Sequence, residues 1–285
     1  MLGQYVVNGL LTGGLYACIA VGFSLVWGVL NIVNMLHGSM VVLGAYFCFY
    51  GVQQLGLPLY VVAPVVCGAL FLFGYAIQAG LLNNLVGQPI LITLTLTFGL
   101  DLIVNNVLIA VFSATPRSLV MDYGALEFHG IRVPVVRVAG MLVAGILTLL
   151  LYWLLRHSKI GRAIIAVRMD RHAAALMGIR IPLIYSLTFG IGALMAGAAG
   201  CAIALIYPVT PMMSGSFLGK AFVICVLGGL GSVPGAIIGG LVLGVVESIG
   251  TLSLGQQWST SMGFIMMMAV IVLFPTGLAG KKGYE

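Results

Sequence analysis

The first hundred residues of the chain, Met1 to Leu100, contain no Asp, Glu, Lys or Arg. A soluble domain needs a charged surface to stay in water. Over all 285 residues, 61% belong to the hydrophobic set and only 6% are charged, against roughly 25% charged residues in soluble domains. These values exclude a soluble globular protein and predict a chain whose surface faces lipid or other proteins.

Apolar runs separated by polar, Gly or Pro residues divide the chain into candidate membrane spans. A transmembrane helix needs about 20 residues, so the apolar content predicts an all-α polytopic integral membrane protein with about eight or nine transmembrane helices. We treat residues 1–285 as a single transmembrane domain. The candidate spans are 5–27, 37–53, 58–78, 89–112, 134–155, 182–207, 234–250 and 259–274.

Two segments predict broken or re-entrant half-helices. The apolar stretch 218–230 is too short, at about 1.5 Å per residue, to cross a hydrocarbon core of about 30 Å. The stretch 31–38 places polar residues and Gly between two spans, which is tolerated at membrane depth only against protein or a water-filled cavity. Two similar short motifs, His37-Gly38 and Gly219-Lys220, each follow a long span. This similarity suggests an inverted repeat with two half-helices around one central site.

The basic residues set the orientation. One loop contains six of the twelve Lys and Arg residues with Asp170 as its single acid, and the positive-inside rule therefore places it in the cytoplasm. This local excess explains the net charge of +6 without a nucleic-acid partner. Counting crossings backwards places the amino terminus outside, whereas the side of the carboxyl terminus stays open. The six residues are Arg156, Lys159, Arg162, Arg168, Arg171 and Arg180.

Within the basic loop, the sequence from Asp170 to Gly178 has an N-cap residue, three alanines and a glycine stop, with Pro182 following. This pattern predicts a short cytoplasmic helix. A solvated connector without a partner is the plainer alternative. The spacing of His172, Ala173, Ala174 and Gly178 resembles the EAA-x-x-x-G element by which permeases of ABC importers dock onto their ATPase subunits, with His172 where that element has Glu.

Further motifs extend this resemblance over nearly the whole chain. They are Asn8-Gly9 with Tyr16-Ala17, the stretch 26–38, Ser158-Lys-Ile-Gly-Arg162, Leu218-Gly-Lys-Ala-Phe222, the stretch 227–236 and Pro275-Thr-Gly-Leu278. Together they resemble the H-type permease of branched-chain amino acid ABC importers. The family's basic stretch after the third span is missing here, because residues 78–88 carry no charge.

The resemblance implies a function and a set of partners. It implies one transmembrane permease domain over residues 1–285 in the bacterial plasma (inner) membrane, with a cytoplasmic coupling loop at 156–181. It further implies a heterodimer with an M-type permease, two ATP-binding cassette subunits that bind ATP and magnesium, and a periplasmic substrate-binding protein. The residues it assigns to ATPase coupling are Arg162, Asp170, His172, Ala173, Ala174 and Gly178.

The chain itself lacks the signatures of catalysis. A P-loop requires GxxxxGK[ST], and Gly215-Ser-Phe-Leu-Gly219-Lys220-Ala221 is one residue short and lacks the hydroxyl that holds magnesium. The four histidines have no metal-ligand spacing. We therefore expect neither enzyme activity nor a cofactor or metal in this chain.

Four ionisable residues lie at predicted membrane depth, where such groups are costly and are functional candidates by default. They are His37, Asp101, Lys220 and Glu247. Each also has a structural reading. His37 would cap a broken helix, and Asp101 would bond Asn105 and Asn106. Lys220 would extend its ammonium from a short helix end toward water. Glu247 would pair with Lys220 or with a polar group on the companion permease.

The leading hypothesis is thus a permease subunit that carries a zwitterionic, aliphatic amino acid inward by alternating access. The alternatives are a permease of the same family for urea, an amide or another small solute, a self-sufficient channel or secondary transporter, and a membrane enzyme. A channel or secondary transporter needs no docking helix. The sequence does not specify the substrate, because in such importers the binding protein selects it first.

Overall fold

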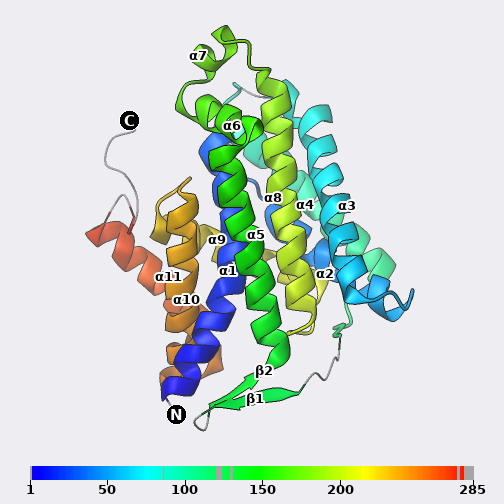
Figure 1. The fold of residues 1–285 in the computed structure, drawn as a ribbon, viewed down its shortest axis with the longest axis vertical. Helices are drawn as coiled ribbons and strands as arrows, with labels where there is room; N and C mark the ends of the chain where they lie inside the picture. Colours follow the sequence, from blue (N-terminus) through cyan, green and yellow to red (C-terminus); the bar gives the residue numbers. More distant parts are fainter. Residues whose placement is uncertain (1, 86, 120–123, 129–130, 275–276, 279–285) are drawn as a thin grey trace.

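The computed structural model describes all residues except 1, 86, 120–123, 129–130, 275–276 and 279–285. Among the described residues, seven helical segments are long and apolar enough to cross a membrane. The chain is therefore a multi-pass membrane protein with an all-α architecture, as predicted (Figure 1). Each candidate span falls on a helix, but the helices at 37–53 and 256–273 are not among the seven.

The first half of the chain contains one long helix, one short helix and two further long helices. The short helix α2 begins at His37, whose side chain contacts Ile19 in the middle of α1. The half-helix break that the sequence predicts at 31–38 is thus present as a non-helical connection. The elements are α1 (Leu2–Leu30), α2 (His37–Gln53), α3 (Leu59–Gly80), the 3-10 turn η1 (Leu82–Leu85) and α4 (Ile90–Phe112).

The middle of the chain links the two halves. A small antiparallel hairpin lies beside the amino-terminal end of α1, and α6 and α7 lie at the opposite end of the molecule (Figure 1). The elements are β1 (Ala125–Phe128), β2 (Ile131–Pro134), α5 (Val135–His157), α6 (Lys159–Met169) and α7 (Arg171–Leu176). The hydropathy pattern did not indicate the hairpin or α6.

The second half repeats the plan of the first. The long helix α8 is followed by a non-helical connection, the short helix α9 and two further helices, and α8 runs opposite to α1 (Figure 1). These elements are α8 (Ile181–Ala204), η2 (Pro211–Met213), α9 (Ser214–Gly228), α10 (Val233–Leu254) and α11 (Gln256–Leu273). The predicted half-helix at 218–230 corresponds to α9, which begins four residues earlier.

The two short helices begin side by side. Gly38 of α2 lies directly against the backbone of Ser214, the first residue of α9. The 17 residues of α2 and the 15 of α9 give lengths of about 25 and 22 Å, less than the hydrocarbon thickness of about 30 Å; α9 is among the seven apolar segments only when the turn η2 is counted with it, as Pro211–Gly228. The structure thus places Gly38 against Ser214, at the start of α9, whereas Gly219 and Lys220 lie within that helix.

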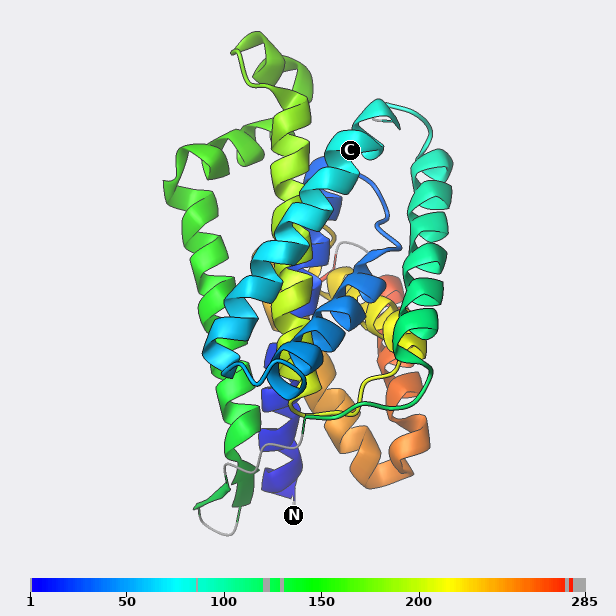
Figure 2. The ribbon, with the colours of Figure 1, turned by 90° about the vertical axis from the view of Figure 1, so that its right-hand side faces the viewer.

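Glycines allow the long helices to pack closely. In a membrane the lipid is as apolar as the side chains, so helix association depends on close packing rather than on the hydrophobic effect. A Cβ on Gly240 of α10 would lie 2.7 Å from the Cα of Ala17, and one on Gly22 of α1 would lie 2.9 Å from the carbonyl oxygen of Gly192. Helices α1 and α8 are consequently the most buried, whereas α4 stands at one side of the bundle (Figure 2).

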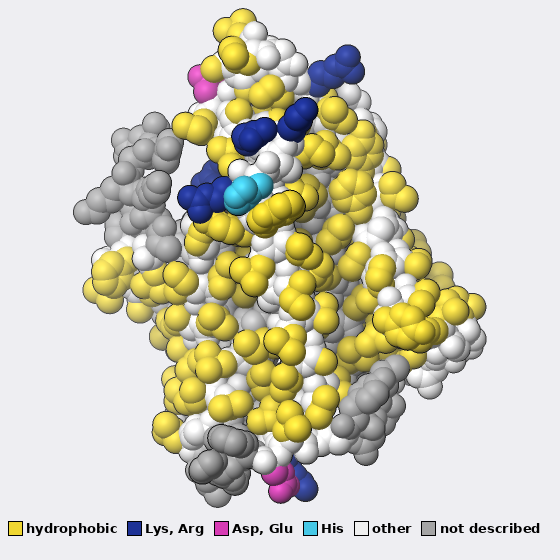
Figure 3. Space-filling model, in the orientation of Figure 1, with side chains coloured by type: hydrophobic (Ala, Val, Ile, Leu, Met, Phe, Trp, Pro, Cys, Tyr) yellow, Lys and Arg dark blue, Asp and Glu magenta, His cyan; other side chains and the backbone are white. Residues whose placement is uncertain are grey.

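Charge is distributed asymmetrically between the two ends. Lys and Arg side chains gather at the end that carries α6 and α7, and a broad hydrophobic band covers the middle of the molecule (Figure 3). The amino-terminal end of α1 lies at the opposite end, beside the hairpin (Figure 1). The arrangement agrees with a cytoplasmic basic loop and an external amino terminus.

Substitution of Gly240 by Ala is expected to disrupt the contact between α1 and α10. The added methyl group would overlap the backbone of Ala17, and overpacking of this kind costs about 1–3 kcal/mol. The midpoint of thermal unfolding in detergent should fall by several degrees. Gly145→Ala on α5 is the matched control, because a Cβ there meets no atom within 4 Å. Equal midpoints for the two variants would contradict the close packing.

Candidate functional site

The first group of candidate residues lies where α2 and α9 begin. The Ser39 hydroxyl, in the first turn of α2, donates to Oδ1 of Asp101. Asn105 Nδ2 donates to Oδ2 of Asp101 at 3.1 Å and to the hydroxyl of Ser214 at 3.0 Å. A carboxylate on α4 is thereby connected to the start of both half-helices, where helix dipoles favour negative charge.

The residues of α4 that make these contacts form a polar stripe. Thr97 Oγ1 donates to the carbonyl of Val33 at 3.1 Å and accepts from the amide of Met35 at 3.3 Å, so it holds the connection between α1 and α2. Residues four apart share one helix face. The stripe consists of Thr97, Asp101 and Asn105, and Thr93, which bonds only within α4, continues it one turn earlier.

Sequence reasoning found only part of this cluster. It named Asp101 and its bond to Asn105, but Asn106 instead donates to the carbonyl of Leu102 at 2.8 Å. Ser39 and Ser214 were missed. The four-residue spacing of polar side chains in an otherwise apolar helix is the signal that would have identified α4 as facing a polar site.

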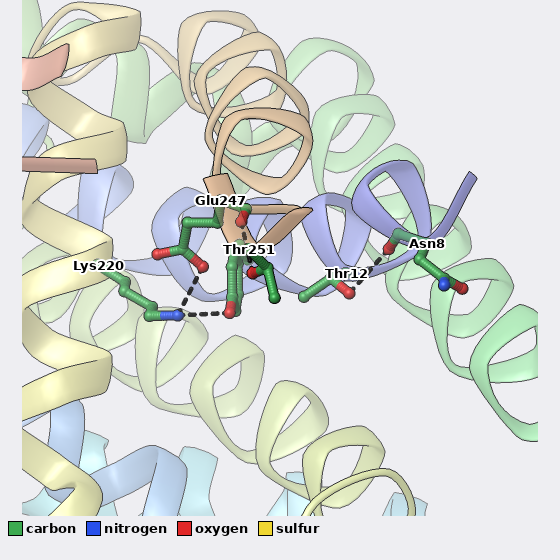
Figure 4. Close-up of polar contacts among 6 residues, drawn as sticks. Asn8, Thr12, Lys220, Glu247 and Thr251 are labelled. Carbon is green, nitrogen blue, oxygen red and sulfur yellow. Dashed lines mark hydrogen bonds and ion pairs between the residues drawn. The ribbon is translucent and has the colours of Figure 1, made fainter. Parts of the chain in front are cut away.

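The second group is a buried ion pair on the other side of α9. Lys220 Nζ lies 2.8 Å from Glu247 Oε2, and it also donates to the hydroxyl of Tyr16 (Figure 4). The Lys220 and Glu247 side chains are only 14% and 9% exposed. The intrachain pairing expected for Glu247 is thus present, and it joins α9 to α10 and α1.

His37 belongs to neither group. It is fully buried, its Nε2 donates to the carbonyl of Ile19 at 2.9 Å, and its ring meets the edge of Phe23. The side chain therefore anchors the start of α2 to α1. The structure places the four ionisable candidates in three separate environments rather than in one cluster.

The predicted cytoplasmic helix is α7, and Asp170 is its N-cap. Asp170 Oδ1 accepts from the backbone amides of His172 at 2.8 Å and Ala173 at 3.1 Å, and Gly178 ends the turn with a φ of +83°. These amide bonds lower the pKa of Asp170. Stabilisation of α7 by the carboxylate is therefore present above the ordinary aspartate pKa and is lost as the pH falls through the lowered value.

The carboxyl-terminal end of α7 exposes apolar side chains, whereas Arg171 and His172 are exposed at its start. Leu176 and Met177 are 90% and 83% exposed, whereas Ala174 is 3% exposed and packs within this chain. Arg162 and Ala173 contribute to a groove of about 730 Å³ between α6 and α7. Leu176 and Met177 thus leave apolar side chains uncovered at this element. A substitution at Ala174 would disturb the loop itself, so it does not test docking cleanly.

No metal site is evident among these groups. Within the described ranges, the structure has no group of three or more His, Cys, Asp and Glu side chains that could hold a metal ion.

Long apolar helices surround two half-helices, and exposed apolar side chains lie at the basic end. The chain belongs to the family described as branched-chain amino acid transport system / permease component, whose model matches residues 5–273. The family consists of membrane permease subunits and not of enzymes.

Curated relatives match almost the full length. The chain is 31% identical to the high-affinity branched-chain amino acid transport system permease protein BraD of Pseudomonas aeruginosa, over 99% of this chain and 97% of the relative. It is 29% identical to the high-affinity branched-chain amino acid transport system permease protein LivH of Escherichia coli K12, over 99% of this chain and 96% of the relative. PsaBC from Streptococcus pneumoniae, solved with a Fab, shares the fold at a TM-score of 0.55 and 12% identity, over 95% and 92% of the two chains.

A double-mutant cycle is expected to show strong coupling between Lys220 and Glu247. Removing one partner of a buried pair costs about 3–5 kcal/mol, because the other charge is left uncompensated. Lys220→Met and Glu247→Leu should each lower the free energy of unfolding in mixed micelles by about that amount, and the double variant should cost less than their sum.

The exposed pair between Arg132 and Glu127 is the matched control. Its atoms lie 2.7 Å apart, but the side chains are 76% and 65% exposed, so its coupling should stay below about 1 kcal/mol. Strictly additive costs at Lys220 and Glu247 would contradict their pairing.

Proposed function

We propose that this chain is the permease subunit through which an ATP-driven importer takes branched-chain amino acids across the bacterial inner membrane. The observation that carries the proposal is the apolar surface of Leu176 and Met177 at the basic end of the molecule. Lipid does not cover a loop that the positive-inside rule places in the cytoplasm. Such a surface fits a protein partner.

The proposed partner at this surface is an ATP-binding cassette subunit, two of which would bind ATP and magnesium in the complete importer. The coupling residues would be Arg162, Asp170, His172, Ala173, Ala174 and Gly178. In this arrangement Asp170 and Gly178 fix the ends of α7, and Leu176 and Met177 enter the partner. An M-type permease as the second membrane subunit and a periplasmic binding protein would complete the assembly.

The proposed substrate rests on the relatives named for branched-chain amino acid transport. Of the four ionisable candidates, Asp101 best fits a position on the substrate route, because it is only half-buried and lies on α4 at the start of both half-helices. We assign positioning roles to Lys220, Glu247 and His37, which fix the half-helices to α1 and α10 around that route.

Reconstitution of the complete complex in proteoliposomes tests this function. Leucine, isoleucine or valine should accumulate only with ATP and the binding protein, while the isolated chain should hydrolyse no ATP. Asp101→Asn keeps hydrogen bonding but removes the charge, so import should fall at least about tenfold, the effect of 1.4 kcal/mol, with assembly intact. Asn106→Ala, at an exposed position on the same helix, is the control.

Each alternative gives a different result in this assay. Accumulation that follows an ion gradient without ATP would indicate a secondary transporter, and import of urea or an amide in place of leucine would change the substrate class. If the Asp101→Asn complex imports leucine at the wild-type rate, the proposed position of Asp101 on the substrate route is wrong.

Leu176→Glu is expected to abolish docking of the ATPase subunit while the permease still folds. A carboxylate in a fully desolvated contact is a buried unpaired charge, which disfavours binding. The stability of the free permease should change little, because the Leu176 side chain is 90% exposed. Co-purification of the subunits and ATP hydrolysis by the complex measure the effect. Leu126→Glu, on the hairpin at the other end of the molecule, is the matched control. If Leu176→Glu binds the ATPase subunit as the wild type does, this surface is not the docking site.

A further inference from the structure

The half-helix α9 ends beside the last turn of α1. The loop that follows α9 makes this contact, because a Cβ on Gly231 would lie 2.9 Å from the Cα of Gly28. Gly28 belongs to the last turn of α1, which ends at Leu30. Since the amino terminus of α1 is expected outside, this end of α1 is cytoplasmic. The backbones of the two segments therefore touch at the cytoplasmic end of the molecule.

A backbone bond from a distant part of the chain caps the same end of α9. The last carbonyls of a helix have no partner within the helix. The amide of Leu278 donates to the carbonyl of Leu227, the last residue but one of α9, at 2.7 Å. Leu227 is fully buried. The chain after α11 thus returns to α9 and supplies a donor that the helix end lacks.

The residue before Leu278 must be glycine. Gly277 has a φ of +78°, a conformation that residues with a side chain rarely adopt. A Cβ there would lie 2.5 Å from the backbone nitrogen of Gly229 and 2.9 Å from the carbonyl oxygen of Val226. Gly277 and Leu278 complete the motif Pro275-Thr-Gly-Leu278, which neither the polar cluster nor the ion pair explains. Their contact with the end of α9 gives these two residues a role.

The coupling loop reaches this place as well. Arg168 lies in the last turn of α6, and its Nη2 atom is 3.5 Å from the position that a Cβ on Gly231 would occupy. A positive charge near the carboxyl end of a helix interacts favourably with the helix dipole. Arg168 therefore connects α6 to the loop that ends α9.

We propose that Gly277 and Leu278 are positioning residues that clamp the end of α9 between α1 and the coupling loop. The start of α9 is held by Ser214, and its middle is held by Lys220. With the clamp in place, a displacement of α6 by an ATPase subunit moves α9 instead of distorting the loop between them. This inference rests on the proposed function, because it takes the coupling loop as the part on which the ATPase subunit acts.

The number of leucine molecules imported per ATP hydrolysed, measured for the complete complex in proteoliposomes, tests this role. A purely structural defect lowers import and hydrolysis together, because less complex assembles, and leaves this ratio unchanged. Leu278→Pro removes the donor N–H, and it should lower the ratio about fivefold, the factor expected for one lost hydrogen bond. Leu278→Ala is the matched control, because it keeps the N–H and shortens a side chain that is 46% exposed.

Two further pairs of variants test the other contacts of the clamp. Gly277→Ala should lower the ratio to a similar degree, because the methyl group would overlap Gly229. Gly255→Ala is its control, since Gly255 also has a positive φ, +87°, but a Cβ there meets no atom within 4 Å. Arg168→Gln should lower the ratio, whereas Arg180→Gln, at an exposed position of the same loop, should not.

Hydrogen exchange on the wild-type complex requires no variant. The amide of Leu278 should be protected, and free exchange at this amide would overturn the clamp. A wild-type ratio in both Leu278→Pro and Gly277→Ala would overturn it too, as would an equal loss in each variant and its control. If the wild-type complex imports no leucine with ATP, the proposed function is wrong, and the exchange of the Leu278 amide still decides whether the clamp exists.

Discussion

The meeting of two helix N-termini inside the membrane is the constraint on which the rest of the structure depends. The first amides of a helix have no partner within it, and the hydrocarbon core offers no water to replace one. Neither α2 nor α9 has a side-chain cap at its own N-cap residue. The polar groups nearby come instead from Ser39, from Ser214 and from the stripe on α4 that contains Asp101 and Asn105. These side-chain contacts attach α4 to the start of both half-helices.

Once the half-helices occupy the centre, the long helices must enclose them closely. This explains why small residues line the contacts of α1 with α8 and α10, and of α8 with α2 and α3. Gly44 of α2, for example, lies against the backbone of Gly197 on α8. The same arrangement leaves α3, α4 and α5 with large exposed apolar surfaces, which suit lipid or a companion subunit. Packing thus separates an inner layer that holds the half-helices from an outer layer that faces the surroundings.

The sequence predicted the features that depend on neighbours along the chain. Apolar run lengths located the spans and both half-helices, and the N-cap Asp170 with Gly178 located α7. Features that depend on tertiary contact were not accessible. Asn105 and Ser214 are 109 positions apart, and nothing local distinguishes Ser214 from other small residues. The contact of Gly38 with Ser214 was not accessible for the same reason, and the burial of Ala174 depends on how α7 folds back against this chain. The pairing of Glu247 with Lys220 was predictable because a buried carboxylate needs a partner and a tight turn joins their helices.

The two polar groups differ in how much a rearrangement would cost. Lys220 and Glu247 are almost completely buried, and separating them leaves uncompensated charges in a medium of low dielectric constant. This pair therefore holds α9 firmly to α10 and α1. In the cluster around Asp101, Ser39 and Ser214 are buried but Asp101 and Asn105 are only partly buried, so breaking its hydrogen bonds costs less free energy than separating the buried ion pair. Helix α4 has few other contacts with the bundle, and its attachment is mainly polar (Figure 2). A change of shape that exposes the start of the half-helices to one side of the membrane consequently costs least if α4 moves and the α1, α9 and α10 unit stays intact.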